Sequence, residues 1–357
     1  MNRVDIARFE FDYDTTWAAF FTDSKLRIYS RYGGRDEHEP ESRLSKASLL
    51  QTMREVSNAH RSATAKTDSN ALDRGPNGSP LADNKSVPHW HPEPKSSTTP
   101  LDIPLLKRNH QGCVHCHQVR EYSLLQAYHD GRFGREMLFT FPLPESLGIE
   151  IDRAHGHRVA RVRDDSASAA AKLIAGDVVV RCEDVPIRSE LDLRWALHRL
   201  PPNSDRFALV VDRSDGKADR STTLRLAFDL PLPSGWRQSE LSWRKSSRSV
   251  PSDWGFRAAA LAKFERREAG LPETGLAIRV LSIKPRGLAQ ALGLQKGDVI
   301  TALGDDTRER TLDRLRSDML RRFVPGDEIR MTIRRDAETL ELSGKFPAWF
   351  TEETSVP

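Results

Sequence analysis

Long apolar runs are missing from this chain of 357 residues. No stretch approaches the roughly 18 consecutive apolar residues that a membrane-spanning helix needs, so we expect no transmembrane segment. The first residues, MNRVDIARFEFDYD, lack a charged head followed by an apolar core, and no signal peptide is visible in them. We expect a periplasmic or cell-envelope location if a signal peptide lies upstream of Met1, and a cytoplasmic one if Met1 is the true start.

A strong excess of one charge is also missing. Lys and Arg number 55 against 51 Asp and Glu, which gives a formal net charge of +4. Because the two signs are mixed, the composition does not favour a nucleic-acid partner. Hydrophobic residues make up 38% of the chain and charged residues 30%, which favours two or three small domains joined by solvated linkers.

Catalytic motifs are absent as well. The chain has no G-x-S-x-G, no G-N-S-G-G, no H-E-x-x-H and no glycine-rich phosphate loop. None of its 11 histidines stands in a context typical of a Ser-His-Asp triad. The sequence therefore argues against a protease and assigns no catalytic residue.

Cysteine is rare, but two of the three cysteines stand close together. Within NHQGCVHCHQ, Cys113, Cys116 and His117 form the pattern C-x-x-C-H. In covalent haem c attachment, the two thiols bond to the haem vinyl groups and the adjacent histidine ligates the iron. We therefore predict a haem c site with these three residues. The candidates for the second axial ligand are Met137, His110 and His129.

Other chemistry at this motif stays open. Zinc is the alternative cofactor, held by Cys113, Cys116 and two of the nearby histidines. A dithiol–disulfide pair and a free structural pair are the remaining interpretations. The histidines that the zinc site would draw on are His110, His115, His117 and His129.

The C-terminal two thirds of the chain contain an internal repeat. One copy includes RVARVRDDSASAAAKLIAGDVVVRCEDVPI and the other LAIRVLSIKPRGLAQALGLQKGDVITALGDD. Their Gly-Asp-Val turns, at Gly176 and Gly297, are 121 residues apart. Such self-similarity predicts two copies of one module. We name residues 145–230 the first repeat and residues 253–346 the second repeat.

Each repeat is expected to continue with an amphipathic helix and a strand pair. Apolar residues at helical spacing predict the two helices, and alternating runs predict strands at 207–211 with 222–226 and at 329–333 with 339–342. The helix residues expected in the cores are Leu193, Ala196, Leu197 and Leu200 in the first repeat, and Leu312, Leu315, Met319 and Phe323 in the second.

This order of strands around a Gly-Asp-Val turn and a late helix resembles PDZ domains, especially those of bacterial HtrA-type proteins. In that family a Φ-Gly-Φ loop, where Φ is a hydrophobic residue, receives the terminal carboxylate of a peptide that adds as a strand. The resemblance implies two PDZ-like, partly open β-barrels that bind peptides or protein C-termini. The implied peptide-binding residues are Leu147, Gly148 and Ile149 in the first repeat, and Trp254, Gly255 and Phe256 in the second.

The N-terminal 60 residues predict a hairpin followed by one helix. Strands are expected at 16–21 and 26–32, and a helix capped by Ser45 runs to about His60. We expect Leu49, Leu50, Met53 and Val56 to form its buried face. The stretch FEFDYDTTWAAFFTDSKLRIYSRYGGRD resembles the last third of a thioredoxin fold, as found in bacterial thioredoxin-like/PDZ fusion proteins, some of them selenoproteins. The thioredoxin C-x-x-C is absent from this part of the chain.

The whole chain is thus expected to be an α+β multidomain protein. Residues 61–100 are dense in Ser, Thr, Pro, Asn and Gly and predict a disordered linker in which His89 and His91 are solvated. The expected function is non-proteolytic binding of peptides or protein partners, linked to a haem or redox centre; the alternative is a pure interaction scaffold. The expected segments are 1–60 thioredoxin-like, 61–100 linker, 101–144 C-x-x-C-H segment, 145–230 first PDZ domain, 231–252 linker, 253–346 second PDZ domain and 347–357 tail.

Overall fold

The structure is a computed structural model in which the chain divides into two compact units. Unit 1 comprises residues 1–102, 110–116 and 139–240, and unit 2 comprises 103–109, 117–138 and 241–357. Among the described residues, no helix is both long and apolar enough to cross a membrane. The residues that the structure describes are 1–35, 39–68, 89–109, 111–201, 204, 206–214, 221–228, 232, 235–238, 255–285, 287–323, 326–336 and 338–345.

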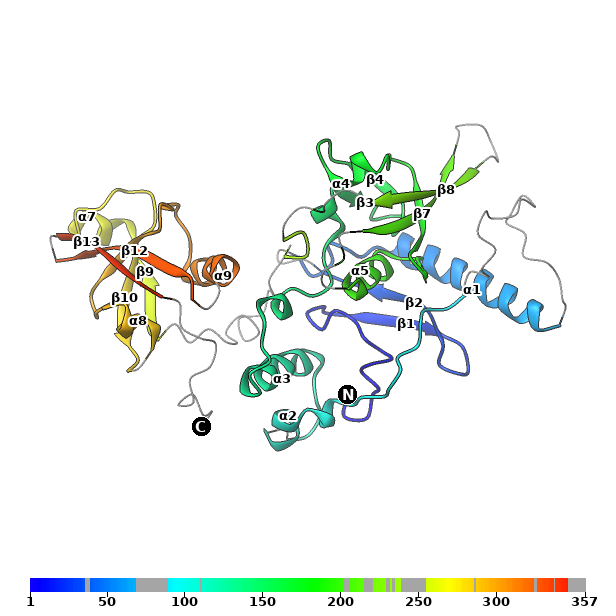
Figure 1. Ribbon diagram of the computed structural model, residues 1–357, viewed down its shortest axis with the longest axis horizontal. Helices are drawn as coiled ribbons and strands as arrows, with labels where there is room; N and C mark the ends of the chain where they lie inside the picture. The colour runs from blue at the N-terminus through cyan, green and yellow to red at the C-terminus, as the bar shows by residue number, and fades with distance from the viewer. Residues whose placement is uncertain are drawn as a thin grey trace. The chain divides into compact units, whose positions relative to one another are not determined.

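Unit 1 begins with the predicted hairpin and helix (Figure 1). β1 (Ala18–Thr22) pairs antiparallel with β2 (Ile28–Gly33), and β2 is buried along its whole length. α1 (Lys46–Asp68) extends beyond the predicted end near His60. Its start follows the prediction, because Ser45 Oγ accepts a hydrogen bond from the Ser48 amide at 3.0 Å. The likeness of this part to a thioredoxin fold stays a prediction.

The predicted buried face of α1 is wrong for Leu50 and Met53, while Leu49 and Val56 are half-buried. The helix packs through polar residues: Ser48 and Thr52 are buried, and the Thr52 hydroxyl donates to the Arg188 carbonyl at 2.9 Å. Leu50 and Met53 are 41% and 46% exposed instead. The Ser48 hydroxyl pairs with the Tyr32 hydroxyl and the Thr52 hydroxyl with the first repeat. This satisfaction of buried polar groups outweighs the apolar periodicity of the helix.

A set of short helices leads from the hairpin to the first repeat. α2 and α3 belong together within unit 2, since the Gln126 side chain of α3 accepts a hydrogen bond from the Leu105 amide at 3.0 Å. The elements are η1 (Pro100–Asp102), α2 (Pro104–Asn109), α3 (Cys116–His129), η2 (Arg135–Leu138) and η3 (Pro144–Leu147).

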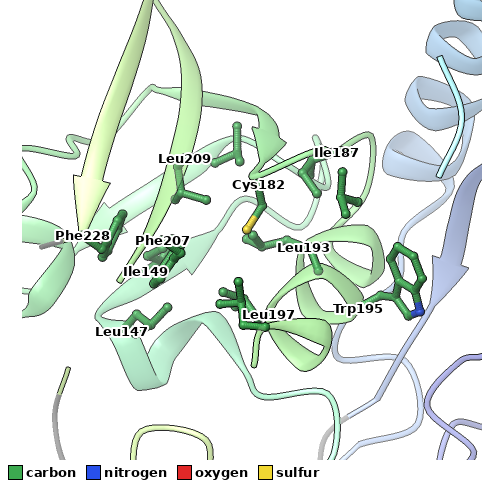
Figure 2. Close-up of a cluster of buried hydrophobic side chains, with 14 of the residues drawn as sticks. Leu147, Ile149, Cys182, Ile187, Leu193, Trp195, Leu197, Phe207, Leu209 and Phe228 are labelled. Carbon is green, nitrogen blue, oxygen red and sulfur yellow. The ribbon is translucent and has the colours of Figure 1, made fainter. Parts of the chain in front are cut away.

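The first repeat folds around one apolar core in unit 1. Its strands form the pair β3-β4 and a sheet of order β6-β5-β7-β8, with a single bridge between Arg158 and Val178 joining the two. Figure 2 shows Leu147, Ile149, Leu193 and Leu197 converging on Phe207 and Leu209, and all are buried. The elements are β3 (Ile149–Ile151), β4 (Val159–Val162), α4 (Ala167–Ala170), β5 (Val178–Cys182), β6 (Val185–Pro186), α5 (Glu190–Arg199), β7 (Phe207–Ser214) and β8 (Ser221–Phe228).

The second repeat, in unit 2, forms one five-stranded antiparallel sheet of order β13-β12-β11-β10-β9. The predicted strand pairs are confirmed in both repeats, as β7 with β8 and β12 with β13. Its elements are β9 (Phe256–Ala260), α7 (Lys263–Glu268), β10 (Ile278–Ile283), α8 (Leu288–Ala291), β11 (Val299–Leu303), α9 (Leu312–Arg322), β12 (Glu328–Arg335) and β13 (Glu338–Lys345).

The two repeats match down to one buried ion pair. Asp177 and Asp298, from the Gly-Asp-Val turns, are each 1% exposed. Each carboxylate receives two hydrogen bonds of 2.8 Å from one guanidinium, that of Arg213 in the first repeat and Arg335 in the second. Such two-point pairing of Arg with a carboxylate fixes geometry as well as energy. The same two-point ion pair therefore occurs at both Gly-Asp-Val turns.

His91 corrects the expectation of solvated histidines near the linker. It is 1% exposed, stacks on Trp195 with ring centroids 5.0 Å apart, and contacts the Arg31 guanidinium. Its amide donates to the Ile28 carbonyl at 2.7 Å. Composition alone misled here, because a polar segment can be held by hydrogen bonds to a neighbouring strand.

Candidate functional site

The second repeat places a helix beside the edge strand of its sheet. β9 is the outermost strand at one end of the sheet, and α9 lies beside it. Arg257, Ala259 and Ala260 of β9 are exposed. Gly255 precedes the strand with a φ of +72°, a conformation that favours glycine. A glycine turn, an edge strand and a flanking helix therefore occur together in this repeat.

The Gly255 turn is held close to a second glycine. Its carbonyl accepts a hydrogen bond from the Lys284 amide at 2.7 Å. A Cβ at position 255 would lie 2.8 Å from the Gly287 Cα. A residue larger than glycine would therefore strain the turn and crowd the backbone of Gly287. Phe256 is 6% exposed and belongs to the buried side of β9. Trp254, the other predicted residue, lies outside the described part of the chain.

α9 is the helix beside β9. Thr311 caps it by accepting a hydrogen bond from the Arg314 amide. Leu315 and Met319 are fully buried in the core, while Leu312 and Phe323 are half-buried. The predicted apolar face of this helix is thus confirmed for the core pair, and its two ends remain partly accessible.

A cluster of ion pairs lies in the loop before α9. Asp306, in the loop before the helix, contacts the guanidinium groups of Arg308, Arg310 and Arg322 at 2.5–2.6 Å. Hydrogen bonds from these arginines hold the pKa of the Asp306 carboxyl well below its usual range. The cluster ties both ends of α9 to one carboxylate and so fixes where the helix lies.

The first repeat has the same glycine turn with different surroundings. Gly148 has a φ of +87°, and its carbonyl accepts a hydrogen bond from the Arg163 amide at 2.9 Å. Leu147 and Ile149 are 1% and 0% exposed. All three predicted residues of this repeat are therefore brought together in one turn, with both hydrophobic side chains in the core (Figure 2).

The C-x-x-C-H motif lies at the start of α3. Asn2 binds the backbone on both sides of Cys113: its side chain accepts from the Val114 amide at 2.8 Å and donates to the Gly112 carbonyl at 3.0 Å. Cys113 is exposed and Cys116 is half-buried, and both thiols are free.

His117 begins α3 together with Cys116. Its Nδ1 lies 3.2 Å from the Glu121 carboxylate one turn later in the helix. A carboxylate at Nδ1 is the partner that metal-ligating histidines commonly have. The thiols and this histidine therefore have the chemistry that haem attachment needs.

The zinc alternative gains no support from the described residues, which contain no group of three or more His, Cys, Asp or Glu side chains arranged to hold a metal ion. His129, a predicted ligand, is exposed and lies 3.3 Å from Asp130. His115 is exposed. His110 lies outside the described residues.

Sequence reasoning missed the charged cluster around α5. Asp192 is fully buried and accepts hydrogen bonds from the Arg31 amide, the Ser30 hydroxyl and the Arg188 amide at 2.7–3.0 Å. Burial raises the pKa of its carboxyl to about 6 against the pull of these donors. The available signal was Asp192 itself, an acid beside the buried Leu191 and Leu193 of an apolar helix.

Three comparisons with known proteins bear on this site. A search of curated proteins found no match. The crystal structure of the HtrA3 PDZ domain bound to a phage-derived ligand (FGRWV) is 21% identical, covering 25% of this chain and 78% of that one, with a TM-score of 0.21. The HtrA-type protease AlgW with decapeptide is 20% identical, covering 42% of this chain and 52% of that one, with a TM-score of 0.22.

The family comparison is local to the second repeat. The family model described as the PDZ domain matches residues 257–345, which begin in β9 and end with β13. The match therefore includes the edge strand, the late helix and the Gly-Asp-Val turn described above. Residues 257–345 of this chain form a PDZ domain.

Proposed function

We propose that the second repeat binds the C-terminal residues of a partner protein in the groove between β9 and α9. The observation that carries this proposal is the position of β9 at the edge of its sheet, with its middle and end exposed and α9 beside it. An extended peptide adds to such an edge through main-chain hydrogen bonds, and the flanking helix selects side chains.

The glycine turn marks the end of the groove at which the peptide carboxylate would bind. With φ at +72°, Gly255 can present backbone N–H groups to an anion, and the peptide carboxylate is the anion that a C-terminus supplies. Leu312 at the start of α9 offers apolar surface to a side chain of the peptide. The bound HtrA3 and AlgW structures support a peptide as the class of ligand. Affinity on the order of 1 μM is expected, since ordering a short peptide offsets much of the contact energy.

A C-terminal peptide library panned against the whole chain tests this function. The wild type should select a consensus that ends in an apolar residue. The selected peptide should bind roughly tenfold more weakly when its carboxylate is amidated, because the turn then loses its anion.

Leu312→Glu is the informative variant, and Leu340→Glu is its matched control. Both leucines are half-buried, but Leu340 lies in β13 at the opposite edge of the sheet. Leu312→Glu should weaken binding by about tenfold or more, because it places a charge where the peptide side chain packs. If no consensus appears, or if both variants bind equally well, the groove is not the site.

A second candidate function is redox or electron-transfer chemistry at a covalently bound haem c. The observation that favours it is the exposed Cys113 thiol beside Cys116, with Glu121 at Nδ1 of His117. Cys113 and Cys116 would hold the haem, and His117 would ligate the iron. When bound, haem supplies one-electron chemistry. This proposal also implies an oxidising compartment such as the periplasm.

A pyridine haemochrome spectrum tests the second candidate on protein made with a haem-attachment system. We expect a c-type band that survives denaturation in SDS and disappears in Cys113→Ser. Cys182→Ser is the matched control, because Cys182 is buried in the core of the first repeat and should leave the band unchanged. Protein without covalent haem under these conditions would eliminate this candidate.

A further inference from the structure

The first repeat differs from the second in the side chains that its late helix presents to the groove. Glu190, Arg194 and His198 stand four residues apart and so share one face of this helix. The N-caps of the two late helices match, Ser189 in α5 and Thr311 in α9, which aligns Glu190 with Leu312. The groove face of α5 is therefore charged where that of α9 begins with an apolar residue.

One arginine of the N-terminal segment joins the two sides of this groove. Nη1 of Arg43 contacts the carboxylate of Glu145, in η3 just before the Gly148 turn, and lies 3.0 Å from the carboxylate of Glu190 at the start of α5. An added strand needs about 4.8 Å to each neighbour in the hydrogen-bonding direction, besides room for its side chains. A single guanidinium nitrogen that touches both carboxylates leaves no such space between them.

The backbone around Arg43 is fixed to the far end of β3. The Arg153 guanidinium donates to the carbonyl groups of Leu44 at 2.6 Å and Glu41 at 2.9 Å, and the Ser45 hydroxyl donates to the Arg153 carbonyl at 2.8 Å. Arg153 lies in the turn after β3, two residues beyond Ile151. Residues 41–45 are thus held over the same stretch of the groove that an upstream peptide residue would enter.

The rest of the α5 face is engaged by the same unit. Arg194 pairs with Asp12 at 2.8 Å, and both side chains are buried. The ring of His198 stacks on Phe141 with centroids 4.7 Å apart. Every member of the Glu190, Arg194 and His198 row therefore has a partner from residues 12–141 of this chain.

We propose that Arg43, assisted by Asp12, is a built-in occupant of the first groove. The first repeat then takes no free peptide while these contacts are in place, and its groove serves as the docking surface of Asp12 and residues 41–45. The inference rests on the proposed function to the extent that the groove is identified from its counterpart in the second repeat.

Hydrogen exchange on the whole chain is the first test. In Arg43→Ala, the amides of residues 146–152 and 190–198 should exchange about tenfold faster than in the wild type, because the bridge between the groove walls is gone. Arg27→Ala is the matched control: Arg27 also pairs with a carboxylate of unit 1, that of Asp23 at 2.6 Å, but away from the groove. It should leave those amides unchanged. A rise below about twofold in Arg43→Ala overturns the proposal.

Peptide selection is the second test. The library is panned against Leu312→Glu, in which the second groove is disabled, and against Leu312→Glu with Arg43→Ala. The first chain should select no consensus and the second should select one. A consensus from the first chain that differs from that of the wild type shows that the first groove is open and overturns the proposal; the wild-type consensus at unchanged affinity counts against the second groove instead.

The two proposals fail in different ways. Loss of selection by the wild type, or an unchanged consensus from Leu312→Glu, counts against the second groove, whereas a different consensus from Leu312→Glu counts against the closed first groove. If Arg43→Ala does not fold, Glu145→Gln replaces it, because it removes one charge from the bridge and keeps the side-chain volume. It should give a smaller rise in exchange of the same sign, and no rise would reject the proposal.

Discussion

The late helices of the two repeats have the same cap and the same number of core residues, but they differ in how much of their surface is buried. Both are capped by a hydroxyl at the N-cap, and both send two residues into the core: Leu193 and Leu197 in α5, and Leu315 and Met319 in α9. α5 then buries its other faces as well, including Asp192 and Trp195, under strand β2 and the segment around His91. A helix covered on all sides acts as scaffold, whereas a helix with accessible ends can take a ligand.

The largest difference between α5 and α9 is the burial of Trp195 against the N-terminal hairpin. Trp195 belongs to the buried cluster of the first repeat and points toward the N-terminal strand (Figure 2), 1% exposed, with the Arg31 guanidinium 3.7 Å from its ring centroid. Trp195→Ala should destabilise unit 1 by about 3–5 kcal/mol, because it empties the contact between α5 and the N-terminal hairpin.

Urea unfolding followed by hydrogen exchange of α5 and β2 checks this prediction. Phe264→Ala in the second repeat serves as control, since Phe264 is 64% exposed and should change stability by no more than about 0.5 kcal/mol. A loss at Trp195 of under about 1 kcal/mol would mean that the hairpin does not depend on α5.

The next prediction concerns what the repeats share. Asp177→Asn and Asp298→Asn should each cost their own unit about 1.5–3 kcal/mol, because a buried acceptor loses charge-assisted bonds from Arg213 or Arg335. The two losses should agree within about 0.5 kcal/mol if the turns are equivalent. Urea unfolding of each variant gives both values, and a silent substitution in one repeat would show that the duplication has diverged at this pair.

The sequence predicted the structure well where the contacts lie within one repeat. The strand pairs, the Gly-Asp-Val turns and the core pair of each late helix follow local periodicity, and they stand in the structure as predicted. The PDZ assignment of the second repeat is confirmed for residues 257–345.

The sequence failed where two distant segments share polar groups. Thr52 bonds to Arg188 and Arg31 bonds to Asp192, more than a hundred residues away in each case. Such contacts leave no periodic trace, so the buried face of α1 and the burial of His91 were misjudged. The proposed haem site depends on a spacing motif, at which Cys113 is exposed and Cys116 is half-buried.

The buried His91 predicts how unit 1 responds to acid. Burial, together with the charges of Arg31 and Arg188, lowers the pKa of His91 well below its usual range. The unfolded chain takes up this proton near pH 6.5 while the folded chain does not, so stability is present above that pH and is lost as the pH falls. The neighbouring Asp192, with a pKa raised to about 6, acts in the opposite direction, adding stability at low pH that is lost as the pH rises through about 6.

A comparison with His91→Phe isolates the histidine. Phe retains a ring over Trp195 but cannot titrate. Between pH 7.5 and 5, the wild type should lose about 1–2 kcal/mol relative to this variant, measured by urea unfolding at each pH. Parallel pH profiles of the two chains would show that the pKa of His91 is not depressed.

The smallest expected effect separates the two N-caps. Thr311→Ala should cost about 1 kcal/mol, the usual value of a cap, because it frees only the Arg314 amide. Ser189→Ala removes the matching bond to the Asp192 amide and also the hydrogen bond that the Ser189 hydroxyl donates to the Arg31 carbonyl of β2. That carbonyl is buried, so its lost partner should add about 1 kcal/mol.

Thermal unfolding of both variants measures the difference, and hydrogen exchange locates it. Faster exchange should reach β2 in Ser189→Ala and stay within α9 in Thr311→Ala. Equal losses confined to each helix would mean that α5, like α9, is capped for itself alone and that the hairpin is held by other contacts.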